Sequence, residues 1–182
     1  MNPAPNLVFV GPMGAGKTTI GTRVATKLAL RFVDVDQRLE ELTGARVPLI
    51  FECEGEAGFR VRESALLAEL CSDSGLLIAT GGGAVLDPDN RRRLRERGYV
   101  VHLHLDVEAQ LARLARDRSR PLLADVDRKV KLTALAAQRD ALYREIADLR
   151  FDSNGPGPNA AAERLAGLIS AQWQRSAHHA VA

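Results

Sequence analysis

The chain has 182 residues, of which 46% are hydrophobic and 26% charged, as in an ordinary globular protein of one domain. Its net charge of +2 gives no case for a nucleic-acid or membrane-surface partner, and no apolar run is long enough to span a bilayer. We expect no signal peptide, because the first predicted strand follows the N-terminus within six residues. Two isolated cysteines, Cys53 and Cys71, match neither a zinc site nor a redox pair, so we expect buried thiols in a cytoplasmic protein.

The first predicted strand, 7–10, leads into a glycine-rich loop that reads Gly11-Pro12-Met13-Gly14-Ala15-Gly16-Lys17-Thr18-Thr19. The loop matches the pattern G-x-x-x-x-G-K-S/T, whose glycines let successive backbone N–H groups point at phosphate oxygens. The N-terminus of the helix that follows adds unpaired N–H groups and the positive end of its dipole. Lys17 is expected between the β- and γ-phosphates, and the Thr18 hydroxyl on Mg²⁺. The alternative, a glycine turn without a ligand, is disfavoured by the strand before the loop and the helical spacing after it.

A short strand is predicted over 31–36, and it ends in two carboxylates, Asp34 and Asp36. Side chains two residues apart on a strand share a face, so this pair should emerge together, about 7 Å apart. The alternative for the pair is a solvated strand end. Helical segments are expected over 37–43, where Gly44 ends the helix, and then over 47–53 and 56–71.

A third strand, 76–80, runs directly into Gly81-Gly82-Gly83. Asp87 and Pro88 are typical of a helix start, and that helix ends at Gly98. It carries five arginines, which we interpret as a solvated face, with an interaction patch as the alternative: Arg91, Arg92, Arg93, Arg95 and Arg97. The fourth strand, 99–105, is followed by a helix that Asp106 caps.

The periodicity fails around Asp117, where 116–123 is predicted to be a mobile loop. A long helix is expected over 128–146, with Leu135, Leu142 and Ile146 buried, and a fifth strand over 149–152. After a Gly-Pro-rich loop comes a last helix, capped by Asn159. Residues 176–182 are predicted to be a disordered tail, with metal binding by its adjacent histidines as the alternative.

Alternating strands and helices predict an α/β fold with a five-stranded parallel sheet between two helical layers. Ligands of such sheets gather at the carboxyl ends of the strands. Four features fall at those ends and should converge: the glycine-rich loop, the two aspartates, the three glycines and the arginine-containing loop after the fourth strand.

The glycine-rich loop alone indicates a nucleoside triphosphatase or a kinase. The sequence has no N/T-K-x-D motif for a guanine base, and its third strand ends in glycine where many ATPases carry an acidic residue. With the loop, four motifs make the chain resemble shikimate kinase from residue 11 to about Asp152. They are Asp34-x-Asp36, Phe59-Arg60, Gly81-Gly82-Gly83 and Arg120-Pro121-Leu122-Leu123. The resemblance implies a P-loop kinase architecture with a lid, transferring the ATP γ-phosphate to the 3-hydroxyl of shikimate.

The resemblance also implies roles for individual residues. Asp36 matches the aspartate that contacts the acceptor hydroxyl, and Asp34 the one that supports Mg²⁺ with Thr18, through water. Arg60 and Arg139 match two arginines that hold the shikimate carboxylate, with a surface position as the alternative for each. The catalytic set is Asp36, Lys17 and Arg120, of which Arg120 matches the lid arginine. Gly82 matches a backbone contact to the substrate ring, which a side chain at that position would obstruct.

The ATP site implied by the resemblance combines the loop with two arginines: Gly14, Ala15, Gly16, Lys17, Thr18, Thr19, Arg113 and Arg120. The chain departs from many relatives after its last strand. There, Asp152-Ser153-Asn154-Gly155-Pro156 replaces a basic residue that packs on adenine. We expect Asn154 or the loop backbone to replace that contact.

The expected organisation is one P-loop kinase domain over 1–175, with a lid at about 116–127. Its expected partners are ATP and shikimate, without nucleic acid or membrane, and we expect a monomer. Gluconate kinase is the first alternative, but it has less use for two carboxylate-binding arginines. A nucleoside monophosphate kinase or a non-catalytic nucleotide-binding module is a further alternative. Loss of Lys17, Asp36 or Arg120 would favour the module, and all three residues are present.

Overall fold

The centre of the molecule is the predicted five-stranded parallel sheet. The computed structural model describes residues 2–117, 121–124, 126–155 and 157–175. In the order β3-β4-β2-β5-β6, the strands span Arg31–Asp34, Leu76–Ala79, Asn6–Val10, Gly98–His104 and Leu149–Asp152. Every pairing between them is parallel. The central strand β2 therefore delivers the glycine-rich loop to the middle of the sheet's carboxyl edge.

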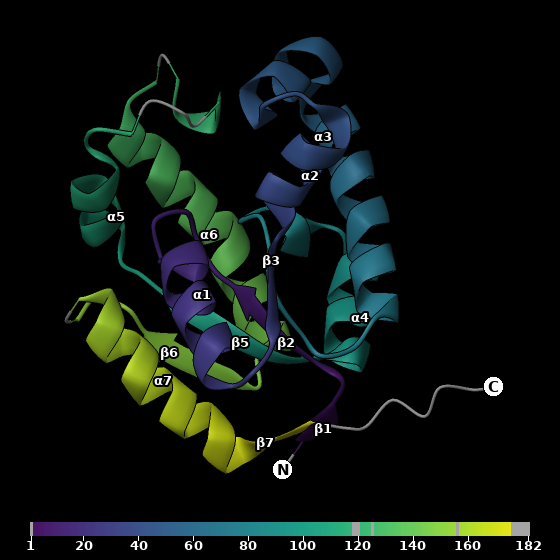
Figure 1. Ribbon diagram of the computed structural model, residues 1–182. Helices are drawn as coiled ribbons and strands as arrows, with labels where there is room; N and C mark the ends of the chain where they lie inside the picture. The colour runs from purple at the N-terminus through teal and green to yellow at the C-terminus, as the bar shows by residue number, and fades with distance from the viewer. Residues whose placement is uncertain (1, 118–120, 125, 156, 176–182) are drawn as a thin grey trace.

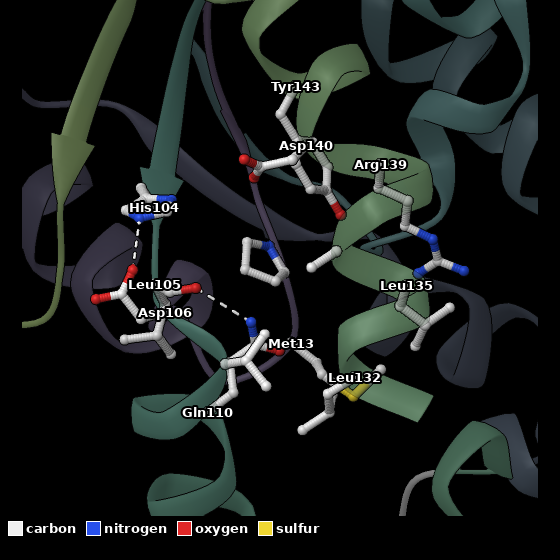
Figure 2. Close-up of a pocket in the computed structure, with 13 residues that line it drawn as sticks. Met13, His104, Leu105, Asp106, Gln110, Leu132, Leu135, Arg139, Asp140 and Tyr143 are labelled. Carbon is white, nitrogen blue, oxygen red and sulfur yellow. Dashed lines mark hydrogen bonds and ion pairs between the residues drawn. The ribbon is translucent and has the colours of Figure 1, made fainter. Parts of the chain in front are cut away.

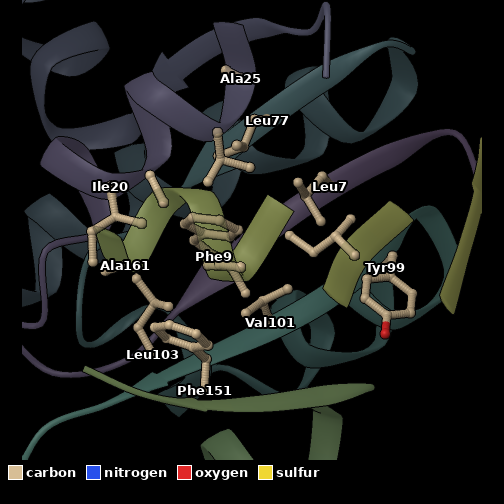
Figure 3. Packing of buried hydrophobic residues seen from close by; sticks show 14 of the residues in the cluster. Leu7, Phe9, Ile20, Ala25, Leu77, Tyr99, Val101, Leu103, Phe151 and Ala161 are labelled. Atoms are coloured by element: carbon tan, nitrogen blue, oxygen red, sulfur yellow. The ribbon is translucent and has the colours of Figure 1, made fainter. Parts of the chain in front are cut away.

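Helices cover both faces of the sheet, as Figure 1 shows. α1 (Lys17–Lys27) and α7 (Pro158–Gln172) pack on one face, and α3 (Val47–Ser72), α4 (Pro88–Arg97) and α6 (Arg128–Ile146) on the other. Alternate residues of β2 serve the two layers, since Leu7 and Phe9 join the first core cluster and Val8 and Val10 the second. Figure 3 shows the first cluster, where Phe9 lies among side chains of α1, α7 and β5. The three-layer α/β/α prediction is confirmed.

Several helix boundaries follow from local chemistry. α6 and β6 have the predicted bounds, and α3 is broken at Gly55, where φ is 70°, between the two predicted segments. The predicted Asn159 cap is wrong, because α7 begins at Pro158, a residue suited to the first helical position. The Asn159 Oδ1 instead accepts a hydrogen bond from Arg23 at 2.6 Å.

Burial corrects three other expectations. Cys71 is buried but Cys53 is exposed, and Leu135 and Leu142 are only half-buried, whereas Leu132 and Tyr143 of the same helix are buried. The arginine-rich α4 is partly a solvated face. Two of its arginines are exceptions, because they donate to backbone carbonyls of neighbouring elements: Arg91 and Arg97.

Two short elements at the ends of the described chain were not predicted. β1 (Asn2–Ala4) and β7 (Trp173–Arg175) form a separate parallel pair, which the Trp173 Nε1–H reinforces by donating to the Ala4 carbonyl at 3.1 Å. The tail predicted over 176–182 lies outside the described residues. Within the described ranges, no helix combines the length and apolar character needed to cross a membrane.

Candidate active site

The glycine-rich loop joins β2 to α1 and borders a cavity of about 300 Å³. Gly11 and Gly16 have φ values of 140° and 90°, which side chains rarely allow, and a Cβ on Gly11 would also meet the Leu103 carbonyl. Lys17 bends back over the loop and donates from Nζ to the Gly11 and Pro12 carbonyls at 2.7 and 2.8 Å. The ammonium and the N-terminal N–H groups of α1 therefore meet at this cavity, which suits an anion.

Most of the predicted ATP residues line this cavity: Gly14, Gly16, Lys17, Thr18, Thr19 and Arg113. Ala15 does not, because its side chain is buried in the core on the α1 side of the sheet, so only its backbone could face a phosphate. Arg120 lies outside the described residues.

The predicted strand over 31–36 is wrong at its end. β3 stops at Asp34, which caps α2 (Val35–Thr43) by accepting from the Asp36 and Gln37 N–H groups at 3.0 and 3.2 Å. Asp36 lies in the first helical turn, because an aspartate before a helix satisfies N–H groups that a strand would leave unpaired. The two carboxylates nevertheless line the same cavity.

Asp34 reaches the phosphate loop with its second carboxylate oxygen. Thr18 donates from Oγ1 to Asp34 Oδ2 at 2.6 Å, while Asp34 Oδ1 serves the helix cap. A hydroxyl and a carboxylate oxygen are the hard donors that Mg²⁺ prefers, and both border the anion cavity. The residues present therefore fit a magnesium ion, held directly or through its waters.

A second cavity adjoins the first and contains both predicted carboxylate-binding arginines. Arg60 of α3 and Arg139 of α6 line it together with Asp36, which also lines the anion cavity. Arg139 is only 5% exposed, which lowers the pKa of its guanidinium, and its Nε has no hydrogen-bond partner among the described residues. A buried donor without a partner at a cavity wall suits an anionic ligand. The surface alternative for Arg139 is therefore wrong.

Sequence reasoning missed Glu63, although it noted the surrounding segment. Glu63 is fully buried on α3, and its Oε2 accepts from Arg60 Nη1 at 2.6 Å. Glu56 accepts from Arg60 Nη2 at 3.0 Å, so two glutamates orient one guanidinium. Burial raises the pKa of Glu63, and the Arg60 charge opposes that shift. The available signal in the sequence was the position of Glu63 three residues after Arg60 on a predicted helix, a spacing that favours an ion pair.

The three consecutive glycines pack against this ion pair. A Cβ on Gly81 would collide with Glu63 Oε1, and a Cβ on Gly83 with the Arg60 guanidinium. A Cβ on Gly82 would meet its nearest atoms at 3.6–3.7 Å, which is ordinary contact. Gly82 therefore has no packing requirement of its own, and its open side faces both cavities.

Tyr143 is the second residue that sequence reasoning left without a role. Its hydroxyl donates to the Gly82 carbonyl, and burial raises its pKa to about 12. Arg139 lies one turn earlier on α6, and its charge opposes the rise in the Tyr143 pKa. Figure 2 shows Arg139 and Tyr143 on neighbouring turns of α6, at the border of a further cavity.

The fourth cavity, of about 330 Å³, extends the anion cavity on its far side. Arg113 stands between them and donates to the Gly14 and Ser153 carbonyls. Gly155 and Gly157 of the loop after β6 also line it. The Asn154 amide is directed elsewhere, because its Nδ2 donates to Asp106 at 3.0 Å.

A parallel sheet with a phosphate loop at its central strand, joined to a cavity with two arginines, defines the chain as a P-loop small-molecule kinase. The shikimate kinase family model matches residues 13–169. A shikimate kinase of Xanthomonas oryzae is 53% identical over 176 residues, covering 97% of this chain and 98% of the relative. One of Stenotrophomonas maltophilia is 54% identical over 178 residues, covering 96% and 97%.

Solved structures agree with the sequence relatives. The shikimate kinase of Acinetobacter baumannii, solved in complex with shikimate, has a TM-score of 0.89 and 46% identity, covering 92% of this chain and 94% of that one. A gluconokinase of Sinorhizobium meliloti, at 17% identity and a TM-score of 0.55, shares the fold alone. The chain belongs to the shikimate kinase family and is an ATP-dependent phosphotransferase with an alcohol acceptor.

Proposed function

We propose that this chain transfers the γ-phosphoryl group of ATP to the 3-hydroxyl of shikimate, giving shikimate 3-phosphate and ADP. One observation carries the proposal beyond family membership. The anion cavity and the two-arginine cavity share Asp36, Gly81 and Gly82, so a nucleotide in the first would meet an acceptor in the second. The relative from A. baumannii, solved with shikimate, supports the choice of acceptor.

Asp36 is proposed to position the acceptor hydroxyl at the junction of the cavities. The acceptor oxygen forms a bond to the γ-phosphorus, the bond to the β–γ bridging oxygen breaks, and the hydroxyl proton passes to Asp36. The transition state of phosphoryl transfer is loose, so an oriented carboxylate suffices without a raised pKa. Lys17 and the N-terminus of α1 are proposed to hold the phosphate charge, and Arg120 is proposed to add a second cationic side chain from the lid.

Thr18 and Asp34 are proposed to hold Mg²⁺, which when bound offsets the charge on the β- and γ-phosphates. The 2.6 Å hydrogen bond from Thr18 Oγ1 to Asp34 Oδ2 supports this role, because it places the two candidate ligand oxygens next to each other. Asp34 acts through a fixed carboxylate, since its other oxygen is held by the cap of α2.

Arg60 and Arg139 are proposed to bind the shikimate carboxylate. Guanidinium groups suit a carboxylate because they offer paired N–H donors. Glu56 and Glu63 orient Arg60, and Arg139 keeps a buried Nε available. On the nucleotide side, Arg113 and the backbone of the loop after β6 are proposed to contact adenosine, in place of Asn154.

The test is a coupled assay of ADP release with Mg²⁺ and ATP, comparing shikimate, gluconate, AMP and no acceptor. We expect turnover with shikimate and only background rates with the other three. Turnover with gluconate or AMP, and none with shikimate, would refute the proposal. ATP binding without turnover on any acceptor would instead favour a non-catalytic module.

A further inference from the structure

β5 and α6 bring three potential metal ligands together, and none of the three is Thr18 or Asp34, the residues that fit a magnesium ion. His102 and His104 are two residues apart on β5 and so share a face of the sheet. Asp140 of α6 faces them, and candidate ligand atoms of the three residues all lie within 4.8 Å of one another. Three such atoms share a point no more than about 2.8 Å from each, against zinc bonds of about 2.0–2.2 Å. Side-chain shifts of less than about 1 Å would therefore close the site.

His102 needs a partner that the described residues do not provide. Its side chain is fully buried, and neither ring nitrogen has a hydrogen-bond partner within the described ranges. Its ring centre lies 5.1 Å from that of Tyr143 and 5.8 Å from that of His104. A buried polar group that stays unpaired is unfavourable, whereas a bound ion would satisfy one nitrogen lone pair.

His104 is arranged as a ligand by a second carboxylate. Its Nε2 lies 3.0 Å from Asp106 Oδ1, while its Nδ1 is buried without a partner among the described residues. Asn154 fixes Asp106 by donating to Oδ2 at 3.0 Å. Hydrogen bonding to Asp106 favours the tautomer with hydrogen on Nε2, which leaves the Nδ1 lone pair for a ligand. Metal-binding histidines commonly have such a carboxylate on the other nitrogen.

The site also has room for a fourth ligand. His104, Asp140 and Tyr143 border a cavity of about 130 Å³, and Figure 2 shows Asp140 on α6 across from the His104–Asp106 pair. That volume exceeds the roughly 30 Å³ that one water occupies in the liquid. The charge partner of Asp140 on its own helix, Arg144, is 3.9 Å away, a long contact that an ion could displace.

We propose that His102, His104 and Asp140 bind a divalent transition-metal ion, with zinc as the best match and water as the fourth ligand. Two imidazole nitrogens and one carboxylate suit zinc, whereas Mg²⁺ prefers oxygen ligands, so this site differs in chemistry from that of Thr18 and Asp34. Asp140 directly follows Arg139. A bound ion therefore ties α6 to β5 and restrains the turn that carries Arg139.

The test uses nucleotide-free protein and Co²⁺ as a spectroscopic substitute for Zn²⁺. The adjacent histidines of the tail are removed first, in a His178→Ala/His179→Ala background. We expect one equivalent of Co²⁺ to give the visible bands of a tetrahedral site, and Zn²⁺ to displace it. No thiolate-to-cobalt band should appear, since Cys53 and Cys71 are not ligands.

Variants then locate the site. His104→Gln and Asp140→Asn should each weaken Co²⁺ binding by a hundredfold or more, and Asp106→Asn by about 10- to 100-fold. Asp89→Asn, an exposed carboxylate on α4, is the matched control and should bind as the background does. Zn²⁺ should raise the Tm of the background protein but not of Asp140→Asn. Absence of stoichiometric binding in the background, or unchanged binding in His104→Gln, overturns the proposal.

Discussion

Glu63→Gln tests whether a buried carboxylate is kept for substrate binding rather than for stability. The substitution retains the shape of the side chain and removes its charge. Glu63 is fully buried, and burial raises its pKa despite the Arg60 charge beside it. Because folding raises the pKa of Glu63, ionisation of this carboxyl opposes folding. The stabilisation that comes from the protonated carboxyl is fully present below its unfolded-state pKa and is lost as pH rises through its folded-state pKa. At pH 8 the Gln variant should therefore be as stable as the parent, or more so.

The expected loss lies in the acceptor KM. Arg60 Nη1 donates to Glu63 Oε2 at 2.6 Å, and a charged acceptor makes such a bond roughly twice as strong as a neutral one. Hydrogen bonds to charged groups contribute about 1.5–3 kcal/mol. Replacing the carboxylate by an amide should therefore cost about 1 kcal/mol of the free energy that orients Arg60, which corresponds to about a fivefold rise in KM. The value of kcat should change less than twofold, because Glu63 does not line the anion cavity.

The assay is steady-state kinetics in shikimate at saturating Mg²⁺ and ATP, with thermal unfolding of both proteins at pH 5.5 and pH 8. Protonation of Glu63 in the parent should raise its KM as pH falls, while the KM of the variant stays flatter. Glu56→Gln is the matched control, since Glu56 also pairs with Arg60 but is 45% exposed, and it should change KM less than twofold. A variant with unchanged KM and a lower Tm at pH 8 would refute the reasoning.

Other expectations separate roles within the site. Asp36→Asn should lower kcat at least about 100-fold with little change in acceptor KM, as single-turnover and steady-state rates would reveal. Arg60→Ala should raise KM more than tenfold and lower Tm, because it strands the Glu63 carboxylate; wild-type kinetics in both variants would contradict these roles. Thr18→Ala should raise the Mg²⁺ concentration for half-maximal rate, measured by titration at fixed ATP. Gly81→Ala should lower Tm through its collision with Glu63, whereas Gly82→Ala should fold normally and lose acceptor affinity, measured by calorimetry; equal Tm values would oppose this.

The sheet was predictable because its strands are short, apolar and separated by helical periodicity. Residues 7–10 of β2 explain this, since they alternate between the two core clusters, and a strand that is buried on both faces gives a continuous apolar run. The end of β3 was not predictable from the same pattern. Asp34 and Asp36 fit a strand by alternation, and only the choice of Asp34 as a helix cap places Asp36 in α2. The β1–β7 pair was not predicted, because strands of three residues carry almost no periodic signal in the sequence.

The site residues divide in the same way. Lys17 and Thr18 belong to a contiguous loop whose geometry follows from its spacing, so the sequence alone predicts that they lie together, and both line one cavity. The burial of Arg139 depends on how α6 packs against the three glycines and on Tyr143, which no local pattern encodes. Long-range packing decides which of many arginines faces a ligand.

The three glycines after β4 show why a short motif can be specific. Gly81 and Gly83 are required by the protein itself, because Glu63 and Arg60 occupy the space that side chains would need. The packing of the protein does not require a glycine at position 82. The Gly82 carbonyl accepts a hydrogen bond from the Tyr143 hydroxyl, and the open side of Gly82 faces the cavities. The outer glycines allow α3 to bring the Glu63–Arg60 pair against the strand end, whereas the proposed ligand contact is the remaining reason for a glycine at the central position. The motif thus joins α3, β4 and α6 at the one point where nucleotide and acceptor would meet.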